Sequence, residues 1–448
     1  MAAKKAPLPN LSLDQLRNML ATLGVKRLLL KELAPNDNSK NQLYLSGSME
    51  VTNILPSGNV TLDETDKGNR IMKAPLPLEW LQPDGTSAPA PYAQLILYPQ
   101  YPEVRSSGFL RGAQNAPSFL LTTRMPGRLL LLGITGDRRI IGWCAGPDSQ
   151  IARAIAALGT LESIGVFRRV PLEAREASSR GILLSELRRI HIRDWITSRA
   201  LRMDGTFVPC ASGQCVGYTL EAELGVSRNG KAEPDFEGWE VKASQVKNFA
   251  RTPASKVITL MTPEPTGGMY KENGVEAFIR EFGYKDQRGR EDRLNFGGIH
   301  RAGEQHLTTN LTLALVGFDC ATQKITDPGG SLCLFTHSGA VAASWGFTAL
   351  LQIWNRKHAQ AVYVPGEVRT EPERQYRYGR VVRLAEDTNF NLFVRALAAG
   401  QVYYDPGIKL ENERGPRPLV KRRSQFRIRS VDLPVLYERM SEVDVMGI

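Results

Sequence analysis

The spacing of apolar residues predicts several helices along the chain. Residues 11–24 place leucines and one methionine three or four positions apart, and Gly24 stands where such a helix would end, so a short amphipathic helix is expected. Similar spacing predicts helices over 148–159 and 182–201. A further helix is expected within 213–225, directly after a glycine-containing turn.

A different pattern fills residues 31–145. Short apolar runs are separated there by Pro, Gly, Asn and Asp, which is typical of strands joined by turns. One run, 129–132, consists of four leucines and closes at a glycine, as expected for a buried strand. Residues 170–180 are polar and charged, which favours a linker. We therefore expect a mostly β N-terminal domain over 1–170 and a second domain over 180–448.

The composition narrows the class of protein. The chain has 448 residues, a formal net charge of +11 and a pI near 9.4, with 42% hydrophobic and 23% charged residues. These fractions are those of a folded protein, and the basic excess suits a polyanionic partner, because each neutralised phosphate releases counterions. An acidic membrane surface or plain solubility would also fit the charge. No apolar run reaches the roughly 20 residues that span a bilayer, so no membrane segment is expected.

The five cysteines are scattered over the chain and form no CxxC pair. Their odd number and wide spacing argue against a zinc site and against a disulfide framework. Cys210 and Cys215 are close enough to share a metal, but no second pair stands at ligand spacing. A reducing cytoplasm is therefore the expected compartment.

The candidate chemistry lies in segment 232–244, AEPDFEGWEVKAS. Alternate residues of a strand face the same side, so Glu240 and Lys242 are expected to project together while Val241 faces the core. A glycine turn brings Asp235, on the preceding segment, beside Glu240. Two converging carboxylates with carbonyl or water oxygens suit Mg²⁺, which polarises a phosphate oxygen and lowers the pKa of a bound water. A lysine beside them can orient or deprotonate the attacking water, or screen the charge that builds on the phosphate.

The spacing Asp-x4-Glu-x-Lys is weak evidence alone, because it arises by chance in many proteins. Pro234 directly before Asp235, the β character around Glu240 and the basic charge of the chain each favour a nuclease over a chance match.

At these residues the sequence resembles a known family. GYTLEAELG followed by EPDFEGWEVKAS is similar to the MvaI/BcnI restriction endonucleases, which have the PD-(D/E)xK catalytic pattern and are themselves similar to the MutH mismatch-repair nickase. Four later segments resemble the family in the same order: MTPEPTGG (261–268), LNFGGIHRAGEQH (294–306), SWGFTALLQIWNRKHAQAVYV (344–364) and KRRSQFRI (421–428). The resemblance covers residues 180 to about 435, a little over half of the chain.

The resemblance implies an α/β (α+β) fold, with a mixed β-sheet flanked by helices, that cleaves double-stranded DNA with Mg²⁺, or with Mn²⁺ in its place. It implies Asp235 and Glu240 as metal ligands, Lys242 as the catalytic lysine, and products with 5′-phosphate ends. Glu221, on the preceding helix, matches an acidic position beside the active site of related nucleases; the alternative is an exposed helix carboxylate. Glu237 is expected to be a turn residue; the alternative is that it substitutes as a nearby carboxylate.

Basic segments supply the candidate DNA contacts. Residues 414–429 include seven basic residues, with a glutamine and a phenylalanine interleaved, and arginine and glutamine are the side chains that make bidentate contacts with guanine and adenine. The expected contacts are Lys247, Arg251, His300, Arg301, Lys421, Arg422, Arg423, Gln425 and Arg427. The alternative for each is a solvated surface position.

The N-terminal domain shows no recognisable site chemistry. Arg105 and Arg111, together with Tyr98, Tyr101 and Phe109, suit a module that reads DNA, either as a second target copy, a modified base or an effector site. A structural or partner-binding module is the alternative.

Three functions stay open at this stage. The first is a restriction enzyme that acts in the cytoplasm against foreign DNA, as a monomer or homodimer, with a companion methyltransferase that protects the host. The second is a repair nickase of the MutH kind, which would need partner proteins. The third is a catalytically silent DNA-binding protein, against which the intact Asp235, Glu240 and Lys242 argue.

Overall fold

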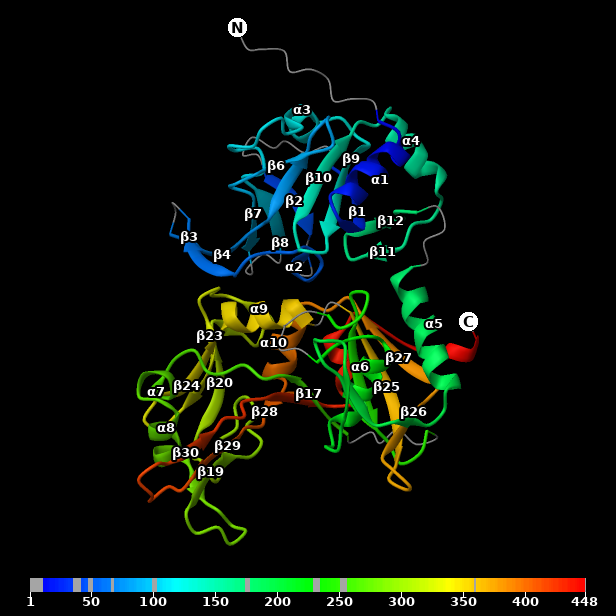
Figure 1. The fold of residues 1–448 in the computed structure, drawn as a ribbon. Helices are drawn as coiled ribbons and strands as arrows, with labels where there is room; N and C mark the ends of the chain where they lie inside the picture. Colours follow the sequence, from blue (N-terminus) through cyan, green and yellow to red (C-terminus); the bar gives the residue numbers. More distant parts are fainter. Residues whose placement is uncertain are drawn as a thin grey trace. The chain divides into compact units, whose positions relative to one another are not determined.

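The computed structural model describes residues 11–34, 42–46, 51–65, 68–98, 103–173, 178–228, 234–249, 256–357 and 360–447. The chain divides into two compact units, Met1–Ser178 and Ser179–Ile448 (Figure 1). No helix in the described ranges is long and apolar enough to cross a membrane.

The N-terminal unit is built mainly from strands. Its elements are α1 (Leu13–Thr22), β1 (Val25–Leu33), β2 (Gln42–Ser46), α2 (Val51–Ile54), β3 (Thr61–Glu64), β4 (Arg70–Pro75), β5 (Leu78–Leu81), β6 (Ser87–Pro89), β7 (Gln94–Tyr98), β8 (Glu103–Ser107), α3 (Ser118–Thr122), β9 (Arg128–Thr135), β10 (Ile140–Ala145), α4 (Gln150–Ala157), β11 (Ser163–Ile164) and β12 (Phe167–Val170).

These strands form two sheets. One has the strand order β11-β12-β1-β9-β10-β5-β6, in which β10 and β5 are parallel and the other pairs antiparallel. The other is antiparallel, with the order β2-β8-β7-β4-β3. The mostly β character predicted for residues 31–145 is confirmed, and the four-leucine run lies in β9.

Two predicted helices of this unit are also confirmed. Ser12 caps α1, since its side chain accepts the backbone N–H of Gln15 while the Gln15 side chain accepts the backbone N–H of Ser12. Leu16 and Leu20 of α1 pack into a core cluster with residues of β1, β9, β10 and α4. Gly24, at φ 80°, follows the helix where a left-handed residue commonly ends one.

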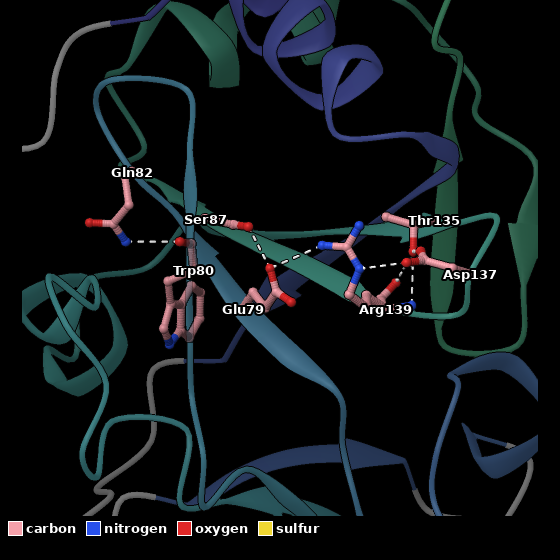
Figure 2. A network of polar contacts seen from close by, with 7 residues as sticks. All are labelled: Glu79, Trp80, Gln82, Ser87, Thr135, Asp137 and Arg139. Carbon is pink, nitrogen blue, oxygen red and sulfur yellow. Dashed lines mark hydrogen bonds and ion pairs between the residues drawn. The ribbon is translucent and has the colours of Figure 1, made fainter.

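A polar network ties the β9–β10 hairpin to the edge of the first sheet (Figure 2). The Arg139 guanidinium lies 3.1 Å from a carboxylate oxygen of Glu79 on β5 and 2.8 Å from one of Asp137 in the hairpin turn. The Ser87 hydroxyl of β6 donates to the same Glu79 oxygen. Because Arg139 and Asp137 are largely solvated, the network fixes the hairpin's orientation more than it adds stability.

The C-terminal unit mixes strands and helices. Its elements are α5 (Ser179–Ile192), β13 (Ile196–Thr197), β14 (Arg199–Leu201), β15 (Phe207–Pro209), α6 (Cys215–Glu223), β16 (Glu240–Gln245), β17 (Val257–Met261), α7 (Met269–Glu272), α8 (Val275–Phe282), β18 (Tyr284–Lys285), β19 (Arg293–Gly297), β20 (Thr312–Val316), β21 (Phe318–Asp319), β22 (Lys324–Ile325), β23 (Ser331–Phe335), β24 (Val341–Gly346), α9 (Phe347–Lys357), β25 (Gln360–Arg369), β26 (Gln375–Tyr378), β27 (Val381–Glu386), α10 (Phe390–Ala398), β28 (Val402–Tyr404), β29 (Gly407–Glu411), β30 (Leu419–Lys421), β31 (Phe426–Arg429), η1 (Leu433–Leu436), β32 (Arg439–Asp444) and η2 (Val445–Gly447).

Strand β25 organises the sheet that carries the candidate site. β16 pairs with it in parallel, with Glu240 opposite Ala361 and Lys242 opposite Tyr363. β26 and β27 pair with it antiparallel, and β13 and β32 extend the sheet beyond them. One face of this sheet is covered by α5 and α6, whose leucines and valines join Trp239, Val241, Val362 and Val364 in one core cluster. The mixed sheet with flanking helices is the α/β (α+β) fold that the resemblance implies.

One predicted helix is shorter than expected. The helical spacing seen over 182–201 ends at Ile192, and the remaining residues form β13 and β14. Asp194 adopts a left-handed conformation (φ 56°), which ends the helix, and the chain beyond it alternates in burial as strands do.

Smaller sheets complete the C-terminal unit. Their strand orders are β17-β31-β28, β18-β19-β29-β30 and β20-β23-β24. Aromatic rings fill the space among them: Trp345 lies edge-on to Tyr404 with ring centroids 4.7 Å apart and to Phe426 at 5.4 Å. This aromatic core holds β31, and with it part of the basic C-terminal run, against β28.

The substitution Leu220→Ala is expected to lower the free energy of unfolding by about 2–5 kcal/mol. The Leu220 side chain of α6 is fully buried in the cluster beneath β16, so its loss leaves a cavity there. Urea denaturation followed by circular dichroism measures the effect. Leu307→Ala, at a position that is 93% exposed, is the matched control and should change stability little. Equal effects of the two substitutions would contradict this packing.

Candidate active site

A tight turn places Asp235 beside the start of β16. Its two central residues, Glu237 (φ 49°) and Gly238 (φ 84°), are both left-handed, which is the conformation of a type I′ hairpin turn. The flanking residues close the turn with two backbone hydrogen bonds of 3.0 and 2.8 Å. One carboxylate oxygen of Asp235, Oδ2, accepts the backbone N–H of Val241 at 2.8 Å. The turn and this bond together fix the Asp235 carboxylate across the hairpin.

Beyond the turn, the side chains of β16 alternate between core and site as predicted. Trp239 and Val241 enter the core cluster with α5 and α6. Glu240 and Lys242 share the opposite face, where the Lys242 ammonium donates to Oε1 of Glu240. The Glu240 side chain is only 4% exposed and that of Lys242 is 24% exposed, so the carboxylate is buried and the lysine is partly open to solvent.

Electrostatics decide the charge state of this pair. Burial disfavours the ammonium of Lys242, but attraction to the Glu240 carboxylate and the hydrogen bond between them, with smaller contributions from Tyr363 and Asp235, raise the Lys242 pKa above its ordinary value. Lys242 is therefore cationic at neutral pH. A cation in this place can orient a water molecule or screen negative charge, and it is a poor proton acceptor.

The same carboxylates suit a divalent cation. Oε2 of Glu240 is buried and finds no hydrogen-bond partner among the described residues, which is a costly state for a carboxylate oxygen. No group of three or more candidate metal ligands occurs in the described part of the chain. Mg²⁺ is commonly held by one or two carboxylates and keeps several waters. Asp235 and Glu240 therefore fit Mg²⁺ better than a cation that needs a complete protein cage.

Helix α6 packs beside β16 and carries two acidic residues with different surroundings. Glu223 is buried, with a side chain that is 1% exposed, and it forms ion pairs with Arg193 at 2.5 Å and Arg199 at 2.6 Å. Glu221, which the sequence analysis singled out, is half-buried two residues earlier and so points to a different side of the helix. Glu223 thus holds α6 to the preceding segment, and Glu221 occupies a separate position on the helix.

A disulfide joins Cys210 and Cys215, contrary to the prediction that the cysteines form none. The loop between them turns back at the start of α6 and brings their Cα atoms to 5.7 Å, within the span of a disulfide. The odd total and wide scatter of cysteines, on which the prediction rested, hid this local pair. Cys144, Cys320 and Cys333 are free.

The basic positions that follow β16 are only partly described. Lys247 is exposed two residues after the strand ends. Arg251 lies outside the described residues. Lys256, just before β17, donates to the carbonyl of Gln245 and so ties the end of β16 to the next strand.

His300 lies inside its loop, whereas the sequence analysis expected it at a DNA surface. Its Nε2 is 2.9 Å from the Thr309 hydroxyl, its Nδ1 is 3.1 Å from the Gly298 carbonyl, and its ring stacks on His306 with centroids 4.2 Å apart. Burial, with repulsion from His306, lowers the His300 pKa to about 3, so the ring is neutral. Arg301, the next residue, is half-buried, and its guanidinium lies 5.3 Å from the centroid of the Tyr403 ring.

The basic residues of the C-terminal run differ in exposure. Lys421, Arg422 and Arg423 are exposed, and Lys421 pairs with Glu411 at 2.6 Å. Gln425 is buried. Arg427, on β31, is 23% exposed and pairs with Asp405 at 2.6 Å. Arg422 and Arg423 are therefore better placed than Gln425 to meet a phosphate backbone.

A polar cavity of about 300 Å³ lies beside this run. Its polar lining comes from Arg301, Glu304, Gln401, Tyr403 and Arg429. Within the described ranges neither Arg301 nor Glu304 has an ion-pair partner, although both face the cavity. Of these residues, only Arg301 was expected from the sequence. The others were missed because the lining is assembled from segments about 100 residues apart, so no local pattern marks it.

Comparison with known proteins identifies the family. The sequence profile of the MvaI/BcnI restriction endonuclease family matches residues 184–437, more than half of the chain. Two solved structures are similar at 16% identity, and each covers 60% of this chain. One is a restriction endonuclease MvaI–cognate DNA substrate complex, covered over 99% of its length with a TM-score of 0.43; the other is MvaI in the absence of DNA, covered over 100% with a TM-score of 0.33. No curated protein sequence matches.

His300 is expected to make the protein less stable as the pH falls. The folded chain binds a proton on His300 only near pH 3, whereas an unfolded histidine binds one near pH 6.5. Between these values the unfolded state holds one more proton, so the free energy of unfolding should fall by up to ~1.4 kcal/mol per pH unit of acidification.

Urea denaturation of wild type and His300→Gln at pH 7 and pH 5 tests this expectation, since the variant lacks that pH-dependent loss. His337→Gln removes an exposed histidine and should keep the wild-type pH dependence. The same pH dependence in wild type and His300→Gln would show that the buried ring is not its source.

Proposed function

Because the chain belongs to the MvaI/BcnI restriction endonuclease family, and is therefore a DNA endonuclease, we propose that it cleaves double-stranded DNA at a site made of Asp235, Glu240 and Lys242. The observation that supports this site most directly is the buried Glu240–Lys242 pair on β16, with an unsatisfied carboxylate oxygen beside the turn that fixes Asp235.

In the proposed mechanism, Asp235 and Glu240 would hold Mg²⁺ through their carboxylates. When bound, Mg²⁺ would polarise the scissile phosphate and lower the pKa of a water molecule. The Lys242 ammonium, kept charged by Glu240, orients the attacking water and screens the charge that builds on the phosphate oxygens. Glu221, half-buried on α6, is the candidate fourth acidic group. Attack by water on the phosphorus with departure of the 3′-oxygen leaves a 5′-phosphate end.

The exposed basic residues are proposed to hold the DNA backbone. Lys247, Arg301, Lys421, Arg422 and Arg423 are the described candidates with solvent access. Contacts with phosphates of this kind are independent of sequence and weaken with salt. Arg427 is the candidate for contact with a base edge, although it would have to exchange its present partner, Asp405.

We propose that the N-terminal unit also recognises DNA and that this recognition regulates cleavage by the nuclease. Two of its arginines lie over tyrosine rings, with Arg111 4.5 Å above Tyr92 and Arg105 5.5 Å above Tyr98. Tyr92 is 52% exposed, so a base can stack there. Phe109 is buried and supplies only its carbonyl, to the Trp80 indole; Tyr101 lies outside the described residues.

The biological setting proposed is restriction of foreign DNA in the cytoplasm, with a companion methyltransferase protecting the host. The site supplies one set of catalytic groups per chain. A monomer would therefore cut the two strands in succession, and a homodimer would cut both at once.

Asp235→Ala and Lys242→Ala are each expected to lower the rate of plasmid cleavage at least about 100-fold, because each removes a group that acts on the transition state. Cleavage of supercoiled plasmid with Mg²⁺, Mn²⁺ or EDTA measures the rate. Glu237→Gln changes an exposed turn carboxylate in the same hairpin and should leave the rate close to wild type. Failure of the folded wild type to cut with either metal would refute the proposed activity.

The double substitution Tyr92→Ala with Arg111→Ala is expected to weaken binding to DNA about tenfold, the loss of roughly one base-stacking contact. Fluorescence anisotropy with methylated and unmethylated duplexes measures binding and shows whether the N-terminal unit distinguishes them. Arg139→Ala removes one positive charge from the same unit, where Arg139 is held by Glu79 and Asp137, and serves as the control (Figure 2). Unchanged affinity of the double variant for both duplexes would leave the N-terminal unit without this role.

A further inference from the structure

Two buried tyrosines lie next to the Glu240–Lys242 pair. Tyr363 of β25 is the register partner of Lys242 on β16, and register partners in a sheet project to the same face. The Tyr363 hydroxyl lies 3.0 Å from the hydroxyl of Tyr437, which directly follows η1. Each tyrosine is 6% exposed. The hydroxyl pair therefore sits on the site face of the sheet, away from the core cluster under α5 and α6.

Glu240 acts electrostatically on both phenols, and Lys242 acts on Tyr363. Burial is the main cause that raises the pKa of both phenols, and the Glu240 carboxylate adds to it at each. The Lys242 ammonium acts on Tyr363 in the opposite direction. Both hydroxyls are consequently neutral at physiological pH, and each retains a proton to donate.

A count of hydrogen-bond donors and acceptors leaves one of each unmatched. Two hydroxyls that bond to one another use one of their two protons, so one O–H still needs an acceptor. Among the described residues, each of the two hydroxyls hydrogen-bonds only to the other. Oε2 of Glu240 is a buried acceptor that lacks a donor. No hydrogen bond joins the hydroxyls to Oε2 in this structure. The two are neighbours through Lys242, which is the register partner of Tyr363 and donates to the other oxygen of Glu240.

We propose that, when the site takes up a divalent cation, the Tyr363–Tyr437 pair donates its spare hydrogen bond to Glu240 and so holds that carboxylate in the orientation that binds the cation. The two tyrosines are then positioning residues, acting through Glu240 without touching the DNA. A carboxylate oxygen has lone pairs for both a hydroxyl donor and a cation, so the two interactions are compatible. Outer partners of this kind typically change metal affinity or activity 10–100-fold when removed. This inference rests on the proposed role of Glu240 as a metal ligand.

The test compares Tyr363→Phe and Tyr437→Phe with wild type, because phenylalanine keeps the ring and removes only the hydroxyl. Mg²⁺ binding to the full chain without DNA, measured by isothermal titration calorimetry, should weaken about 10–100-fold in both variants. The Mg²⁺ concentration that gives half-maximal plasmid cleavage should rise in parallel. The rate at saturating Mg²⁺ should fall much less.

Tyr376→Phe is the matched control. Tyr376 is fully buried in the same sheet but belongs to the core cluster on the opposite face, where its hydroxyl accepts from Arg374 at 3.3 Å. Its Mg²⁺ affinity should equal that of wild type. Circular dichroism and urea denaturation of all three variants identify any loss of folding.

Two outcomes would overturn the inference while leaving the proposed function standing. The first is wild-type Mg²⁺ affinity in folded Tyr363→Phe and Tyr437→Phe. The second is an equal loss of affinity in Tyr376→Phe, which would make the effect a general one of stability. A wild-type chain that neither binds Mg²⁺ nor cuts DNA would overturn the proposed function and this inference together.

Discussion

Parallel pairing of β16 with β25 fixes the positions of Glu240 and Lys242. Because the pairing runs along the whole of β16, the strand cannot rotate, and its odd and even residues are committed to opposite faces. Trp239 and Val241 are held in the core by α5 and α6, and burial of these side chains drives the packing. Glu240 and Lys242 are thereby forced to the other face, where the core offers them no apolar contact.

Three glutamates are buried among the described residues of the C-terminal unit, Glu223, Glu240 and Glu367. The contrast between Glu223 and Glu240 distinguishes a structural carboxylate from a candidate catalytic one. Taking a carboxylate out of water costs several kcal/mol unless partners replace the water. Glu223 has two arginines for this purpose. Glu240 has one lysine, and its second oxygen has no partner in the described part of the chain. An under-satisfied carboxylate beside a fixed second carboxylate is the condition that a hard cation relieves.

Local patterns in the sequence predict what is locally determined. The alternation about Val241, the capped helix α1 and the leucine strand β9 all follow from short-range spacing, and each is confirmed. Features that depend on how the chain folds back on itself left no such signal. The disulfide depends on how one loop turns, the burial of His300 depends on Thr309 and His306 folding over it, and the tyrosine pair joins residues 74 positions apart. The roles of Asp235, Glu240 and Lys242 come from the resemblance and stay predictions.

The length of the turn between Asp235 and Glu240 limits which mutations this site can accept during evolution. A strand has a period of two, so one residue inserted between Gly238 and Glu240 would exchange the two faces of β16 unless the register with β25 slipped to compensate. The Glu240 carboxylate and the Lys242 ammonium would then be driven into the core, and the Trp239 indole would be turned to the site face. The number of residues in this hairpin therefore decides which side chains of β16 face the site. Substitutions at the exposed Glu237 keep this length and are tolerable, whereas single-residue insertions and deletions change it and are not.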